Sequence, residues 1–98
     1  MLYVVKRDGR KVEFDAVKIS NAIKGAAEEI AFDMKESEIM SLTQRVIKKI
    51  EDSHKKEISV EDIQNLVERV LIDNNFNEIG YAYSNYRKER NKNKRNKI

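Results

Sequence analysis

Apolar residues repeat at three-and-four spacing through most of the chain after residue 15, and no proline interrupts the repeat. This period places apolar side chains on one face of an α-helix. It predicts four helices, over residues 16–31, from about 37 to 52, from 59 to about 73, and from about 77 onward. The apolar positions are Ile19, Ala22, Ile23, Ala26, Ala27 and Ile30, then Ile39, Leu42, Val46 and Ile50, then Ile63, Leu66, Val67, Val70 and Leu71. The last helix is expected to carry Ile79, Ala82, Tyr83 and Tyr86 inward. Because 98 residues have room for one core, we expect a single domain.

Polar residues mark where these helices begin. Asp15, Ser37 and Ser59 each precede an apolar repeat, and a side-chain oxygen at that position accepts a hydrogen bond from the first turn. Glu57-Ile58 is expected to form a short strand just before the third helix, and Asn74-Asn75 to end that helix.

The chain opens with a predicted β-hairpin. Residues 2–7 and 10–14 are strand-like and flank Asp8-Gly9, a pair favoured in two-residue type I′ turns. With the strand near residue 57, this predicts an α+β fold in which a small N-terminal hairpin or three-stranded sheet packs over a four-helix bundle.

A two-residue turn would make the hairpin tip strongly basic. Arg7 would lie opposite Arg10, and Lys6 opposite Lys11. Two further pairs would make the base apolar, namely Val5 with Val12 and Tyr3 with Phe14. Directly opposed like charges cost a few tenths of a kcal/mol up to about 1 kcal/mol, so a bound polyphosphate would relieve them. The alternative is that the long side chains extend into water, with Asp8 and Glu13 as counter-charges.

Lys18 adds to this basic region. It falls in the first turn of the first helix, where the helix dipole disfavours a cation and a nearby anion compensates. If the hairpin folds over this helix start, Lys6, Arg7 and Lys18 converge with free backbone N–H groups, a combination that binds phosphate. The sequence contains no glycine-rich phosphate loop of the Walker or dinucleotide type.

The net charge of +3 is unevenly distributed. Seven of the 20 basic residues follow Tyr86 with one of the 17 acidic residues, so residues 1–86 carry 13 basic and 16 acidic groups, or −3. The basic end could attract nucleic acid. The simpler explanation is a solvated end or a linker.

Several chemistries are excluded or disfavoured by composition. The absence of cysteine excludes disulfides, thiolate metal sites and a cysteine nucleophile, and a single histidine, His54, argues against a metal site. We find no Ser-His-Asp arrangement and no carboxylate cluster with metal-ligand spacing, so we do not expect an enzyme. No apolar stretch approaches the length of a signal or membrane helix, and we expect a cytoplasmic protein.

Three segments carry a resemblance to a known family. They are Val4-Val5-Lys6-Arg7-Asp8-Gly9-Arg10-Lys11-Val12-Glu13-Phe14-Asp15-Ala16-Val17-Lys18-Ile19, then Ile58-Ser59-Val60-Glu61-Asp62-Ile63-Gln64-Asn65-Leu66-Val67-Glu68, and Ala82-Tyr83-Ser84-Asn85-Tyr86-Arg87-Lys88-Glu89-Arg90. The first resembles the opening motif of the ATP-cone family, regulatory nucleotide-binding domains of ribonucleotide reductases, and the likeness covers nearly the whole chain. The last is most similar to the anaerobic, glycyl-radical class of ribonucleoside-triphosphate reductase. The resemblance implies an ATP-cone over residues 1–90 and a basic tail or linker over 91–98.

The resemblance also implies a ligand and its contacts. ATP or dATP, with or without Mg²⁺, would lie under the hairpin and be bound without hydrolysis. The implied nucleotide-binding residues are Val4, Lys6, Arg7, Asp15, Lys18, Ile19, Ser59, Ile63, Gln64 and Lys88. Val4, Ile19 and Ile63 would border the base and Asp15 its polar edge; Lys6, Arg7, Lys18 and Lys88 would face phosphates; Ser59 and Gln64 would lie near the sugar and phosphates.

Structural roles are the alternative for several of these positions: packing for Ile19 and Ile63, helix capping for Asp15 and Ser59, and solvent exposure for Gln64 and Lys88. Two positions depart from the family pattern, Val12, which is polar in some relatives, and Tyr81. Tyr83 and Tyr86 have the geometry to stack on a base, but aromatic residues at helical spacing usually belong to the core, where we place Tyr86.

In this family, dATP favours an inhibited assembly and ATP an active one. The implied partners are therefore adenine nucleotides, a ribonucleotide reductase catalytic domain or subunit, and other cones in a homo-oligomer. The rival hypothesis is a small nucleic-acid-binding or transcriptional module that uses the basic tail. The charge of −3 over residues 1–86 and the acidic third helix argue against it.

Overall fold

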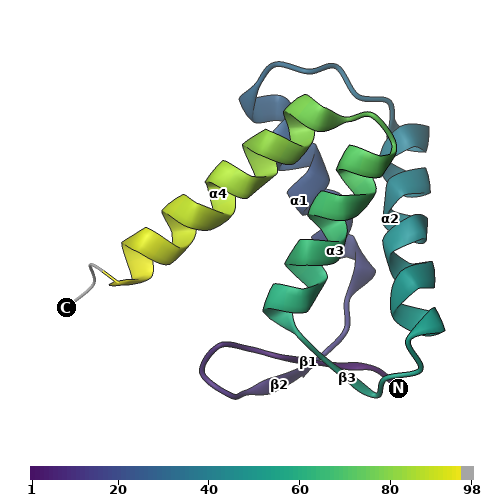
Figure 1. The fold of residues 1–98 in the computed structure, drawn as a ribbon, viewed down its shortest axis with the longest axis vertical. Coiled ribbons are helices and arrows are strands. Elements are labelled where there is room, and N and C mark those ends of the chain that lie inside the picture. Colours follow the sequence, from purple (N-terminus) through teal and green to yellow (C-terminus); the bar gives the residue numbers. More distant parts are fainter. Residues whose placement is uncertain (96–98) are drawn as a thin grey trace.

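A computed structural model describes residues 1–95, with side chains through Lys88 (Figure 1). The elements in order are β1 (Tyr3–Val5), β2 (Lys11–Glu13), α1 (Ala16–Glu29), α2 (Glu36–Asp52), β3 (Glu57–Ser59), α3 (Val60–Asp73) and α4 (Asn77–Arg95). The strands form one sheet in the order β2-β1-β3, with β1 antiparallel to β2 and parallel to β3. The predicted α+β fold and its third strand are confirmed.

The four helices form a bundle in which each helix packs against two others. α1 contacts α2 and α4, and α3 contacts α2 and α4. Their apolar faces meet in a core whose largest fully buried side chains are Ile23, Val46, Val67, Val70, Leu71 and Ile79. The sheet lies at one end of this bundle, and α4 leans away from the other helices on the side where the hairpin projects (Figure 1). This arrangement brings the hairpin, the start of α1, α3 and α4 around one region.

Two of the three predicted helix caps are present in the structure. The Asp15 carboxylate accepts a hydrogen bond from the Val17 N–H at 3.0 Å, and the Ser59 hydroxyl oxygen accepts one from the Asp62 N–H at 3.0 Å. The predicted Ser37 cap is wrong. Lys35 occupies the cap position of α2, and the Glu38 carboxylate accepts its backbone N–H at 3.1 Å. Glu38, which lies in the first turn, thus supplies a hydrogen-bond acceptor for a backbone N–H group at the start of α2.

The last helix is longer than the apolar repeat predicts. It runs through Arg95, into the segment expected to be a basic tail. Lysine and arginine are good helix formers, which favours continuation of the helix into this segment. Residues 96–98, the end of the predicted tail, lie outside the described residues.

The hairpin turn contains three residues and not two. The Lys6 N–H donates to the Arg10 carbonyl at 2.7 Å, and the Gly9 N–H donates to the Lys6 carbonyl at 2.9 Å. Gly9 has φ +90°, whereas Asp8 is not in the left-handed region. The Asp8 carboxylate accepts the Arg10 N–H at 3.0 Å, which stabilises a turn that needs positive φ only at glycine. The predicted type I′ turn is therefore wrong.

The longer turn shifts the register by one residue. Val4 pairs with Val12, and Val5 with Lys11. Because alternate strand residues face opposite sides, the shift exchanges the two faces of one strand relative to the other. Val4 and Val12 now share the inner face, and Tyr3 and Val5 do not join them there.

The shift replaces the two expected cationic pairs at the tip with one, Lys6 opposite Arg10, and the other charges near the tip are paired. Arg10 forms an ion pair with Asp8 at 2.7 Å, and Lys11 forms one with Glu57 at 2.7 Å. Arg7 approaches Glu61 at 3.3 Å. The prediction of two opposed cationic pairs is wrong, because these three side chains find carboxylates on the turn, on β3 and on α3.

Candidate functional site

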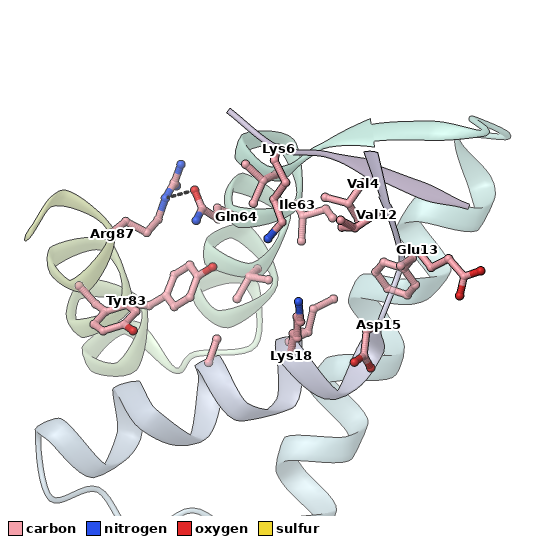
Figure 2. A pocket seen from close by; sticks show the side chains of 16 residues that line it. Val4, Lys6, Val12, Glu13, Asp15, Lys18, Ile63, Gln64, Tyr83 and Arg87 are labelled. Atoms are coloured by element: carbon pink, nitrogen blue, oxygen red, sulfur yellow. Dashed lines mark hydrogen bonds between the residues drawn. The ribbon is translucent and has the colours of Figure 1, made fainter. Parts of the chain in front are cut away.

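A cavity of about 170 Å³ lies between the hairpin, α1, α3 and α4. Its apolar wall comes from all four elements, and polar groups stand at its edges (Figure 2). The lining residues are Val4, Lys6, Val12, Glu13, Phe14, Asp15, Lys18, Ile19, Ala22, Val60, Ile63, Gln64, Val67, Tyr83, Tyr86 and Arg87. A mainly apolar cavity with a few convergent polar groups is the usual form of a small-molecule site.

Local periodicity explains why these side chains face the cavity. Val4 in β1 and Lys6 just after it are two residues apart in extended chain and share a face, and Val12 joins them because it pairs with Val4. In α3, Ile63, Gln64 and Val67 follow the three-and-four spacing of one helix face. The same spacing brings Lys18, Ile19 and Ala22 of α1 to the opposite wall.

Two lysines from different elements meet over this cavity. Figure 2 shows Lys6, which follows β1, and Lys18 on α1 pointing toward one another from opposite sides. Lys18 stands in the first turn of α1, where the helix dipole adds positive potential. The two ammonium groups favour an anion between them, although Glu13 and Asp15 add carboxylates to the same lining.

Backbone N–H groups at this helix start, which are expected to be free, are largely hydrogen-bonded to Asp15. The Val17 N–H is bonded to the Asp15 carboxylate, and the Lys18 N–H reaches the Asp15 carbonyl at 3.2 Å. Asp15 therefore lines the cavity while it caps α1. Side-chain charge supplies more of the anion-binding potential here than backbone N–H groups do.

Arg87 of α4 holds a second polar edge of the cavity. Its Nε donates to Gln64 Oε1 at 3.1 Å, and its Nη1 donates to Asn65 Oδ1 at 3.0 Å and to Glu68 Oε1 at 2.8 Å. Gln64 Oε1 also accepts from Arg7 Nη2 at 3.3 Å. The polar face of α3 thus binds one arginine from the hairpin and one from α4.

Seven of the ten predicted binding residues line the cavity: Val4, Lys6, Asp15, Lys18, Ile19, Ile63 and Gln64. Arg7 lies beside it, bonded to Gln64 and Glu61. Ser59 ends β3 and caps α3 and does not line the cavity. Lys88 is exposed and is not in the lining either.

On α4, sequence reasoning predicted Lys88 as a binding residue and missed Arg87. Tyr86 was expected in the core, but 47% of its surface is exposed and it lines the cavity beside Tyr83 and Arg87. A spacing of four residues brings Tyr83 and Arg87 to the same helix face, so the sequence contained a signal for Arg87. Val12 lines the cavity, whereas Tyr81 is 66% exposed and stands outside it.

The described residues contain neither a metal-binding cluster nor a membrane-spanning helix. Among residues 1–88, no group of three or more histidine and carboxylate side chains is arranged to hold a metal ion. No described helix is both long enough and apolar enough to cross a membrane.

Comparison with known proteins agrees with this geometry. Residues 2–92 match the family model described as ATP cone domain. The chain is 37% identical over 87 residues to the anaerobic ribonucleoside-triphosphate reductase of Haemophilus influenzae, an alignment that covers 89% of this chain and 12% of that protein. The chain thus spans about an eighth of the length of this relative. The chain therefore belongs to the ATP cone domain family and is a nucleotide-binding regulatory domain.

Proposed function

We propose that the cavity binds ATP or dATP without hydrolysing it, and that the bound nucleotide controls the activity or assembly of a ribonucleotide reductase. The observation that carries the proposal is the pair Lys6 and Lys18, which point toward one another at the edge of an apolar cavity (Figure 2). A nucleotide has the matching composition, an apolar heterocycle joined to a polyanion.

The lining suggests how the ligand is oriented. Val4, Ile19 and Ile63 form buried apolar surface suited to the base, and Lys6 and Lys18 supply charge for the phosphates. Arg7 lies close enough to join them. Any Mg²⁺ would accompany the phosphates. Ser59 and Lys88 lie off the cavity wall and have no direct contact in this proposal.

Regulation requires that ligand binding favour one arrangement of the domain or its partners over another. A nucleotide shifts such an equilibrium only by its differential affinity for the two states. The hairpin and α4 both line the cavity and both bond to Gln64, so they are the elements that report occupancy. We propose that they act on a reductase catalytic domain or subunit, or on another cone in a homo-oligomer.

The relative's name supports an anaerobic reductase as this partner, and we propose that the two act together in the cytoplasm. In this proposal the nucleotide-binding unit ends near residue 90, and residues 91–98 serve as a basic tail or as a linker to the catalytic domain.

Calorimetric titration with ATP, dATP and adenosine tests the proposal. We expect both nucleotides to bind more tightly than adenosine, because the two lysines contact phosphates. Lys6→Gln should weaken ATP binding by about fivefold to tenfold, while Lys24→Gln, on the exposed surface of α1, should not. A folded protein that binds neither nucleotide below millimolar concentration would contradict the proposal.

A further inference from the structure

Arg87 of α4 is bonded to three residues of α3. Its side chain is 16% exposed, and Glu68, its ion-pair partner at 2.8 Å, is 25% exposed. Gln64 and Asn65 accept its other hydrogen bonds. Arg87 also lines the cavity, so one guanidinium lies at the boundary between the cavity and the acidic side of α3.

Several cations surround the cavity, and some of them are already paired with carboxylates. The cations Lys6, Lys18 and Arg87 line it, and Arg7 stands at its edge. The two arginines, however, are paired with carboxylates of α3, Arg7 with Glu61 and Arg87 with Glu68. A guanidinium binds phosphate and carboxylate through the same N–H groups, so the two kinds of anion compete for it.

We infer that Glu68 lowers the affinity of the cavity for nucleoside triphosphates by competing with their phosphates for Arg87. The inference rests on the proposed function and adds a residue that sets its affinity. When the cavity is empty, Arg87 donates a hydrogen bond to the Glu68 carboxylate. When a triphosphate binds, some of the N–H groups of Arg87 donate to a phosphate oxygen and no longer to α3. Glu68 also acts through space, because its negative charge repels a polyanion nearby.

Glu61 has the same relationship to Arg7 in a weaker form. Its side chain is 62% exposed, and the distance to the Arg7 Nε is 3.3 Å. Solvent screens an exposed pair more than a partly buried one. The effect of Glu61 on triphosphate affinity should therefore have the same sign as that of Glu68 and a smaller size.

The exchange also links the ligand to the position of α4. The hydrogen bonds of Arg87 to Gln64, Asn65 and Glu68 connect α4 to the polar face of α3. A phosphate that accepts hydrogen bonds from Arg87 weakens this connection. The same side chain therefore affects both the affinity for the nucleotide and the contact between α3 and α4.

Glu68→Gln tests the inference, because glutamine keeps an oxygen that accepts from Arg87 and loses the charge. ATP affinity, measured by calorimetry on the folded variant, should rise by about threefold to fivefold. Glu61→Gln should give a smaller rise. Glu28→Gln makes the same charge change on the exposed surface of α1 and should leave affinity unaltered. Adenosine affinity should not respond to Glu68→Gln.

A double-mutant cycle identifies Arg87 as the intermediary. Arg87→Gln should weaken ATP binding, and in that background Glu68→Gln should lose most of its benefit. Unchanged or weaker ATP binding by Glu68→Gln, with wild-type binding intact, overturns this inference alone. A wild-type protein that is folded by circular dichroism but binds neither ATP nor dATP overturns the proposed function and this inference together.

Discussion

Gln64 Oε1 accepts a hydrogen bond from Arg87 Nε at 3.1 Å across the contact between α3 and α4. The same oxygen accepts from Arg7 Nη2 at 3.3 Å, so one amide joins the hairpin tip to the last helix. Both arginines come from elements that border the cavity. Gln64 thus connects the hairpin to α4 through a shared hydrogen-bond acceptor.

Gln64→Leu should separate these two elements. Leucine has similar bulk but accepts no hydrogen bond, so we expect the free energy of unfolding to fall by about 1 kcal/mol. The Gly9 N–H, which closes the hairpin turn, should exchange faster with solvent. Urea unfolding and amide exchange measure the two effects. Gln44→Leu, on the exposed surface of α2, is the control and should produce neither change.

Lys18→Gln should change stability and affinity in opposite directions. A cation in the first turn of α1 opposes the helix dipole, so removing it should raise the free energy of unfolding of the empty protein by a few tenths of a kcal/mol. ATP affinity should fall by about fivefold, because the phosphates lose a cationic partner. Thermal unfolding and calorimetric titration test the pair, with Lys24→Gln as control. A loss of stability in Lys18→Gln would show that the lysine has a structural role instead.

Two glycine substitutions should have opposite signs. Gly9 has φ +90°, so a side chain there is strained, and Gly9→Ala should lower the free energy of unfolding by about 1 kcal/mol. Gly25 lies inside α1 with nothing within 4 Å of an added Cβ, so Gly25→Ala should raise it by about 0.5–1 kcal/mol. Gly9→Ala should also weaken ATP binding by disturbing the strand that carries Lys6. Equal effects of the two substitutions in denaturant melts would argue against a positive φ at Gly9.

Acid should loosen the hairpin turn before it unfolds the helices. The hydrogen bond from the Arg10 N–H, aided by its guanidinium, holds the pKa of Asp8 below its ordinary value of 3.8. A lowered pKa means that the ionised form stabilises the turn above the unfolded value, and this contribution is lost as pH falls through the folded pKa. The Arg10 amide resonance, followed by NMR below pH 4, should report this loss. In Asp8→Asn the resonance should show no such titration.

The helices and most of their starts were predictable because their causes are local. Ile19, Ile23 and Ala26 repeat at the helical period and are buried, and Asp15 and Ser59 carry the oxygen that caps the next turn. Ser37 also had capping chemistry, but the chain entered α2 two residues earlier, where Glu38 could serve Lys35. Local sequence signals identify the residues that could cap a helix, but they do not determine which of these residues does so.

The cavity was less predictable, because it joins elements distant in sequence. The motif around Lys6 and Lys18 placed two cations near each other, and the structure brings both to one cavity. The contribution of Tyr86 and Arg87 depended on how α4 packs on α1 and α3 before it diverges from them, which no local period encodes.

The amino-acid sequence alone determined that this chain forms an α+β domain with an N-terminal hairpin, four helices and a basic region near Lys6. Those features follow from residue periodicity, turn residues and side-chain charge. Tertiary structure decided the pairing of Val4 with Val12 and the partners of Arg7 and Arg87. The physical reason for the pairing is that the Asp8 carboxylate, through its bond to the Arg10 N–H, favours a turn with positive φ at one residue and not two, and the register was settled only when the sheet formed. The ion pairs depend on tertiary structure because carboxylates on β3 and α3 lie beside the hairpin and α4 only in the packed domain.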